Sequence, residues 1–108
     1  MEKDYIIIAG RKYRVEANWN ALSAFLRSLG ADLSVLTREL SMPEWTELLV
    51  ASVREGQRLD GDEPDMTAQI FGQLRPIDAL HAITEFQAIY LRQNAADPAA
   101  ADEDKKKA

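Results

Sequence analysis

The chain of 108 residues contains no cysteine and only one histidine, and both features remove classes of chemistry. Without cysteine there is no disulfide, no thiolate zinc site and no cysteine nucleophile. The single histidine, His81, follows Asp78 by three positions, but no serine or threonine stands in a setting typical of a nucleophile. A general base needs a group to activate, so we interpret His81 as a surface or boundary residue.

Long apolar runs are lacking near the start of the chain. The run at residues 5–9 has five residues, whereas a membrane span needs about 20 and a secretory signal needs a longer apolar region with a cleavage site. We therefore expect a cytoplasmic protein that does not enter a membrane. The net charge of −5 is spread along the chain, which makes binding to nucleic acid phosphates an unfavourable interpretation.

An acidic cluster in the segment RLDGDEPD, formed by Asp60, Asp62 and Asp65, raises the question of calcium. An EF-hand loop counted from Asp60 would need a glycine at its sixth position and a glutamate at its twelfth, where this chain has Asp65 and Phe71. We therefore predict a solvated loop in which Asp65 caps the following helix. Scattered glycines form no phosphate-binding loop, so we expect neither enzyme activity nor a metal or cofactor.

A β-hairpin is predicted at residues 5–17. The run YIIIA is rich in β-branched and aromatic residues, and Gly10-Arg11 fits a two-residue type II′ turn. This register pairs Ile8 with Tyr13. It makes one face of the hairpin wholly apolar, formed by Ile6, Ile8, Tyr13 and Val15. A lone hairpin is marginal in water, so this face must pack on another element.

Helical patterns fill residues 18–94. Asn18 can cap the first helix and Gly30 can end it. Its predicted inner stripe is Trp19, Leu22, Phe25, Leu26 and Leu29. A short helical turn follows, with Leu33, Leu36 and Leu40 on one side. We expect each of these stripes to pack on the core, because apolar residues recur at helical spacing.

The second half of the chain predicts three further helices. Ser41 and Glu44 form a capping box, with proline in the first turn, and Gly56 and the DGDEPD segment are expected to end that helix. Its inner stripe is Trp45, Leu48, Leu49, Ser52 and Val53. A short helix is expected at 66–73 and a long one at 77–94. The inner or partly inner residues of the long helix are Leu80, Ile83, Phe86, Ile89, Tyr90 and Leu91.

These patterns together predict an α+β fold. An N-terminal two-stranded β-hairpin packs against a bundle of four to five helices, so that most of the chain is helical. Residues 1–94 form a single globular domain. Residues 95–108 have no aromatic or β-branched side chain, so we expect a disordered charged tail.

Five residues are candidates for binding a partner. Arg11, Lys12 and Arg14 form a small basic spot at the hairpin tip that could meet an acidic protein. Trp19 and Trp45 could anchor an interface, since tryptophan often has that role. Both tryptophans also fall on inner helical stripes, so packing in the core is the alternative.

The order of these segments resembles a known family. A hairpin of the form I-x-G-x-x-Y, here Ile8 to Tyr13, precedes a helix with Asn20 and Ala21 near its start, and several small helices follow. In this layout the chain is similar to the tail assembly chaperones of long-tailed bacteriophages, prophages and gene transfer agents. The resemblance runs from YIIIAGRKYRV through NWNALSAFLRSLG and the helices to Arg92.

The resemblance implies a non-catalytic function. Such a chaperone would bind the tape-measure protein in the host cytoplasm, help recruit tail-tube subunits, and be absent from the mature virion. Two alternatives remain open: a structural subunit associated with a phage tail or capsid, and a small bacterial adaptor or regulatory protein-binding domain. The sequence also leaves open whether the chain forms a homo-oligomer.

Overall fold

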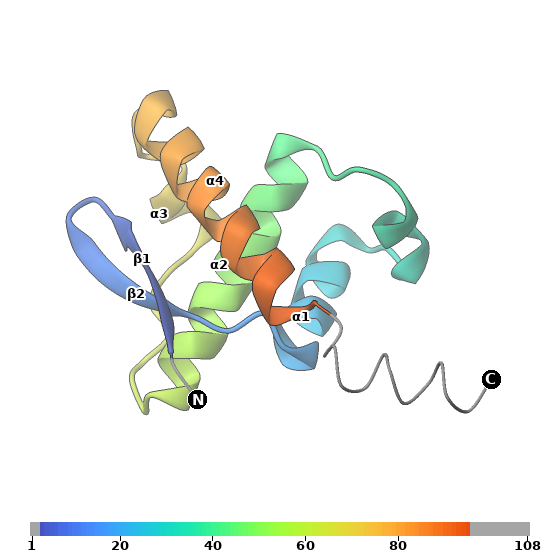
Figure 1. Cartoon of the computed structure of the whole chain (residues 1–108), viewed down its shortest axis with the longest axis horizontal. Helices are drawn as coiled ribbons and strands as arrows, with labels where there is room; N and C mark the ends of the chain where they lie inside the picture. The colour runs from blue at the N-terminus through green and yellow to red at the C-terminus, as the bar shows by residue number, and fades with distance from the viewer. Residues whose placement is uncertain (1–2, 96–108) are drawn as a thin grey trace.

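The computed structural model describes residues 3–95 and confirms the predicted α+β fold, with a hairpin packed on helices (Figure 1). The predicted tail lies outside the described residues apart from Ala95. In chain order the elements are β1 (Asp4–Ile8), β2 (Arg11–Val15), α1 (Trp19–Leu29), the 3-10 helix η1 (Leu33–Thr37), α2 (Met42–Leu59), α3 (Ala68–Phe71) and α4 (Pro76–Gln93).

The hairpin turn lies one residue earlier than the sequence predicts. β1 pairs antiparallel with β2, and Ile8 stands opposite Arg11, so Ala9 and Gly10 form the turn. Their φ angles of 51° and 79° are both positive, as in a type I′ turn rather than type II′. The predicted pairing of Ile8 with Tyr13 is therefore wrong, and Tyr13 pairs with Ile6.

This error leaves the faces of the hairpin unchanged. Moving the turn by one residue shifts the pairing by two residues, and side chains in a strand alternate with a period of two. The predicted apolar face is consequently the buried one, formed by Ile6, Ile8, Tyr13 and Val15. It packs between α2 and α4, which contact β2 and β1 respectively.

Helix α2 ends at Leu59, directly before the DGDEPD segment as predicted, but Gly56 lies inside the helix and does not end it. A Cβ at this position would lie 2.3 Å from the carbonyl oxygen of Arg14, so only glycine lets the backbone of β2 approach the helix this closely. One turn earlier, the Ser52 carbonyl accepts a hydrogen bond of 3.1 Å from the Glu16 amide. The backbones of hairpin and helix are thus in direct contact.

The predicted caps of α1 and α2 are confirmed. The Asn18 side chain accepts from the Ala21 amide at 3.1 Å, and Gly30 ends α1 with a φ of 63°. At α2, the Ser41 amide donates to the Glu44 carboxylate at 2.8 Å, and the Ser41 hydroxyl accepts from the Glu44 amide at 3.3 Å. These reciprocal bonds are a complete capping box.

The predicted cap of α3 is wrong. Thr67, not Asp65, caps this helix, since the Thr67 hydroxyl accepts from the Ile70 amide at 3.1 Å. Asp65 instead accepts a hydrogen bond of 2.6 Å from the buried side chain of Gln57. The Gln57 side-chain oxygen also accepts from the Asp65 amide at 3.2 Å, so the loop after α2 is attached to the helix itself.

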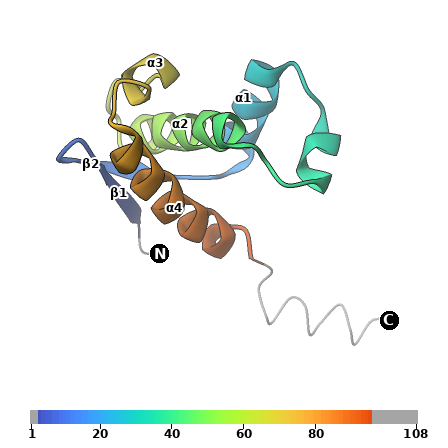
Figure 2. The same ribbon diagram turned by 90° about the horizontal axis from the view of Figure 1, so that it is seen from above.

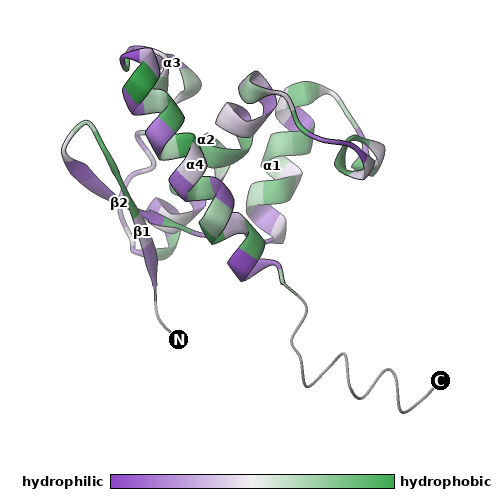
Figure 3. Ribbon diagram, turned by 45° about the horizontal axis from the view of Figure 1, so that its top comes forward, coloured by the Kyte–Doolittle hydropathy of each residue, from purple (hydrophilic) through white to green (hydrophobic). Residues whose placement is uncertain are grey.

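Several side chains predicted to point inward are exposed. Trp19 is 65% exposed. Successive residues of an α-helix are about 100° apart around the axis, so Trp19 lies about 120° around α1 from the buried Phe25. In η1 the buried residue is Val35, while Leu33 is exposed. On α4, Leu80 and Leu91 face outward, although Ile83, Phe86 and Ile89 are buried as predicted. Bands of hydrophobic and hydrophilic residues alternate along α4 (Figure 3).

We expect Gly56→Ala to lower the free energy of unfolding by about 1–3 kcal/mol, because the added methyl group would overlap the Arg14 carbonyl. In a helix interior without such a contact, a change from glycine to alanine raises the free energy of unfolding by about 1 kcal/mol. The sign of the change in this free energy therefore shows whether the close contact exists. Urea denaturation measures it. Gly72→Ala, where an added Cβ meets its nearest atom at 3.2 Å, should change stability less. Unchanged or raised stability of Gly56→Ala would contradict the close contact.

Candidate functional site

An apolar groove lies between α4 and the segment that joins η1 to α2. Its volume is about 510 Å³, within the range of roughly 300–1,000 Å³ typical of binding pockets. The apolar side chains lining it are Leu36, Leu40, Met42, Trp45, Tyr90 and Leu91. Arg38, Glu39 and Gln87 supply its polar groups. A mostly apolar concavity with a few polar groups at its margin is suited to receive an apolar ligand or chain.

Trp45 forms a rigid part of this groove. Its ring packs edge-on against Tyr90, with centroids 5.6 Å apart, and against Phe86, with centroids 6.2 Å apart. Phe86 is fully buried, whereas Trp45 and Tyr90 are partly buried and also line the groove. Trp45 therefore packs on the core, as one interpretation of the sequence expected, and also offers a surface to a ligand.

The margin of the groove is fixed by an ion pair. The Arg38 guanidinium donates two hydrogen bonds to the Glu44 carboxylate, at 2.8 and 2.7 Å. These bonds, followed by the bond from the Ser41 backbone, lower the pKa of Glu44 to about 2. The same carboxylate completes the capping box of α2, so the segment that forms one wall is held in place before any ligand binds.

A smaller pocket of about 60 Å³ adjoins the groove at Tyr90, which lines both. The exposed Trp19 is part of this pocket, together with Leu22 and Leu48. Trp19 and Trp45, two of the candidate partner-binding residues, thus line neighbouring pockets that share one aromatic side chain.

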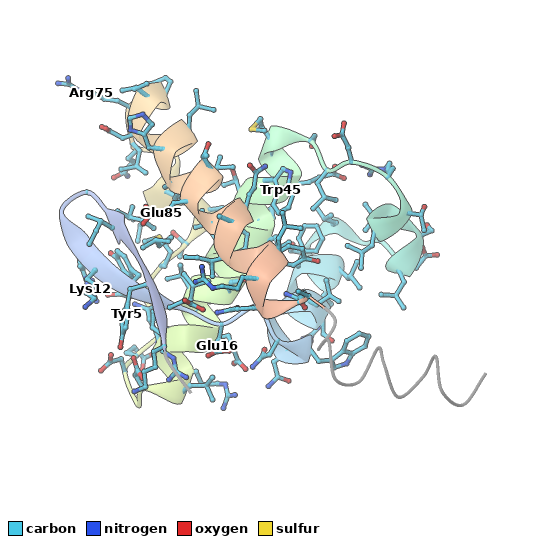
Figure 4. All side chains as sticks on the ribbon, viewed as in Figure 1. Tyr5, Lys12, Glu16, Trp45, Arg75 and Glu85 are labelled. Atoms are coloured by element: carbon cyan, nitrogen blue, oxygen red, sulfur yellow. The ribbon has the colours of Figure 1, made fainter. Side chains whose placement is uncertain are left out.

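The basic candidates lie elsewhere and are engaged within the chain. Figure 4 places Lys12 on the hairpin, on the opposite side of α4 from Trp45. The Arg11 guanidinium lies 3.1 Å from the Asp65 carboxylate, and the Arg14 guanidinium lies 2.7 Å from the Asp60 carboxylate. The Lys12 ammonium lies 4.3 Å from the centre of the Tyr5 ring. The structure therefore does not bring the basic spot together with the groove.

The residues weighed for catalysis do not line the groove. His81 and Asp78 are exposed on α4. Across residues 3–95 no cluster of three side chains could hold a metal ion. The carboxylates of Asp60 and Asp65 instead accept hydrogen bonds from Arg14 and Gln57.

Glu55 is the one buried carboxylate among the described residues, and its environment keeps it ionised. It accepts hydrogen bonds from Arg58 at 2.6 Å, Asn18 at 2.6 Å and Asn20 at 3.0 Å. Arg58 is the main cause that lowers the pKa of Glu55 to about 2, and the two asparagines contribute. This cluster ties the start of α1 to α2 and has a structural role.

Sequence reasoning missed the groove because it assigned Leu36, Leu40, Tyr90 and Leu91 to the core. One signal was present: apolar residues surround much of α4, whereas packing on a core needs only one apolar face. Residues on the remaining side had to stay at the surface or meet another chain. The sequence pattern alone does not show which side of α4 packs on the core and which side stays at the surface.

Comparisons of the chain with known protein families, with curated proteins and with solved structures find no match. None of the helices within residues 3–95 has the length and hydropathy needed to cross a membrane. The geometry of the groove and the resemblance in layout are therefore the basis for a functional proposal.

We expect Glu55→Gln to lower the free energy of unfolding by about 1–3 kcal/mol at neutral pH, because the hydrogen bonds to a charged acceptor weaken. Folding lowers the pKa of Glu55 from about 4.5 to about 2, so its stabilisation is present above pH ~4.5 and is lost as the pH falls towards 2. The difference between variant and wild type should shrink over that window.

Urea denaturation at neutral pH and near pH 3 measures this difference. Glu63→Gln is the matched control, since no described residue forms an ion pair with Glu63. A loss of stability for Glu55→Gln that is the same at both pH values would show that the carboxylate charge is not what stabilises the cluster.

Proposed function

We propose that this protein is a non-catalytic tail assembly chaperone that binds the tape-measure protein and helps recruit tail-tube subunits. It would act in the host cytoplasm and be missing from the finished virion. The resemblance of the hairpin and α1 to that family supports the assignment. The observation that carries it is the apolar groove between α4 and the η1–α2 segment.

The lining of the groove suits a helical client. Amphipathic helices bind by inserting apolar side chains into hydrophobic grooves, and such grooves often contain methionine and aromatic residues. Met42 is 47% exposed at the mouth, and Leu91 is 65% exposed beside it. A tape-measure protein, which the resemblance implies to be long and helical, offers many segments of this kind.

The groove is small and is formed by residues of the chain itself. The Arg38–Glu44 pair, which links the segment before α2 to the first turn of that helix, is formed within the chain itself. A groove of about 510 Å³ accepts only a few side chains of a client. A chaperone must release its client, and limited contact is consistent with that requirement.

The test is co-expression of the chain with a tape-measure protein from the same genome. We expect wild type to keep this client soluble and to be recovered in complex with it. Met42→Glu should lower the soluble fraction and the recovered complex at least tenfold, because a carboxylate would enter the apolar groove. The variant should fold normally, since negative charge is favourable in the first turn of a helix.

Ile70→Glu on α3 is the matched control, because Ile70 has the same 47% exposure as Met42 but does not line the groove. It should behave as wild type. Failure of the wild-type chain to bind the client or raise its solubility would contradict the proposal. Detection of the chain as a stoichiometric part of purified virions would instead indicate a structural subunit.

A further inference from the structure

Helix α4 has two apolar faces, and the core needs only one. Ala82, Ile83, Phe86 and Ile89 are buried against the rest of the molecule. A second set faces outward at intervals of three and four residues: Ile77, Leu80, Thr84, Ala88 and Leu91. Ile77 is 57% exposed and Leu80 is 48% exposed, so these large side chains are accessible. Such spacing places all five on one side of the helix, which we call the outward face of α4.

The outward face contains no charged residue. With about 100° per residue, its five members span roughly 80° of the helix circumference. The charged or titratable side chains of α4 occupy the adjoining sector: Asp78, His81, Glu85 and Arg92. A surface helix normally places charged and polar residues opposite its buried stripe. Folding of this chain therefore does not account for an uncharged outward face.

The outward face runs directly into the groove. Leu91 belongs to the outward face and also lines the groove. Gln87, one turn before Leu91 on α4, lines the groove as well. From Ile77 to Leu91 the helix rises about 21 Å, the length of four helical turns. All five residues of the face are exposed, and Figures 1 and 2 show that one long side of α4 is not covered by another described element. A helix of a partner could lie along α4 and insert a side chain into the groove at one end.

The carboxylates of α4 beside the outward face are not engaged in ion pairs with other described residues. Asp78 and Glu85 form no ion pair with any residue between 3 and 95, whereas Arg92 is paired with Asp4 and Arg38 with Glu44. Glu85 lies along α4 on the side of the hairpin (Figure 4). The chain as a whole carries a net charge of −5. A partner with basic residues at this edge would gain both attraction and correct alignment.

We infer that the outward face of α4 and the groove form one docking site for an amphipathic helix that carries lysine or arginine beside its apolar stripe. This inference rests on the proposed function and specifies the chemistry of the client. Thr84 and Ala88 are small and lie in the middle of the face, so the axes of the two helices can approach closely. The basic flank of the client helix faces Asp78 and Glu85.

The test uses the full chain and two synthetic 18-residue helical peptides with the same leucine stripe. One peptide has lysines beside the stripe and the other has glutamates. Calorimetric titration at low salt should give at least tenfold tighter binding of the lysine peptide. Ala88→Lys should weaken that binding at least tenfold. Glu85→Lys should reduce the preference for the lysine peptide, and Glu63→Lys, the same substitution in the loop after α2, should not.

Thermal melts of each variant ensure that only folded proteins are compared. Equal affinity for both peptides, or unchanged binding by Ala88→Lys, would overturn the inference. Self-association of the chain that Ala88→Lys abolishes and the peptides do not displace would also overturn it, by identifying a second copy as the occupant.

If these tests fail while the tape-measure client still depends on Met42, only the proposed function stands. If the lysine peptide binds as expected but the client is unaffected, only the docking chemistry stands.

Discussion

The fold depends on the backbone contact between β2 and α2 at Gly56. A two-stranded hairpin is not stable alone in water, so its apolar face must be covered. The missing side chain at Gly56 lets the Arg14 carbonyl approach the helix, and one turn away the Glu16 amide donates to the Ser52 carbonyl. This contact brings the buried face of the hairpin onto α2, which thereby becomes the central helix of the domain.

The candidate binding surface is a consequence of that arrangement. The hairpin occupies one side of α2 and α1 another, and α4 then contacts both α2 and β1 with a single face. The apolar side chains of Ile77, Leu80 and Leu91 on its other side remain exposed among the described residues. Near the end of α4, Tyr90 and Leu91 meet the η1–α2 segment, which the Arg38–Glu44 pair holds in place, and the groove forms between them.

Local signals in the sequence predicted much of this fold, because the interactions that they describe are local. The caps at Asn18 and Ser41 and the left-handed end at Gly30 involve residues within a few positions of each other. Tertiary contacts were the source of the errors. Gly56 looks like a helix terminator, but it is present because β2 approaches there, and helical periodicity cannot tell which apolar side of α4 meets the core. The groove was unpredictable for the same reason.

We propose that a client helix binds the groove and the outward face of α4. Methyl NMR spectra of the full chain, recorded with and without a tape-measure fragment, test it most directly. We expect the largest chemical-shift changes on the methyl groups of Met42, Ile77 and Leu91. Ile7 on the hairpin and Ile70 on α3 are comparably exposed reference positions and should change little. Changes confined to Ile7 and Ile70, with Met42 and Leu91 unaffected, would contradict the claim.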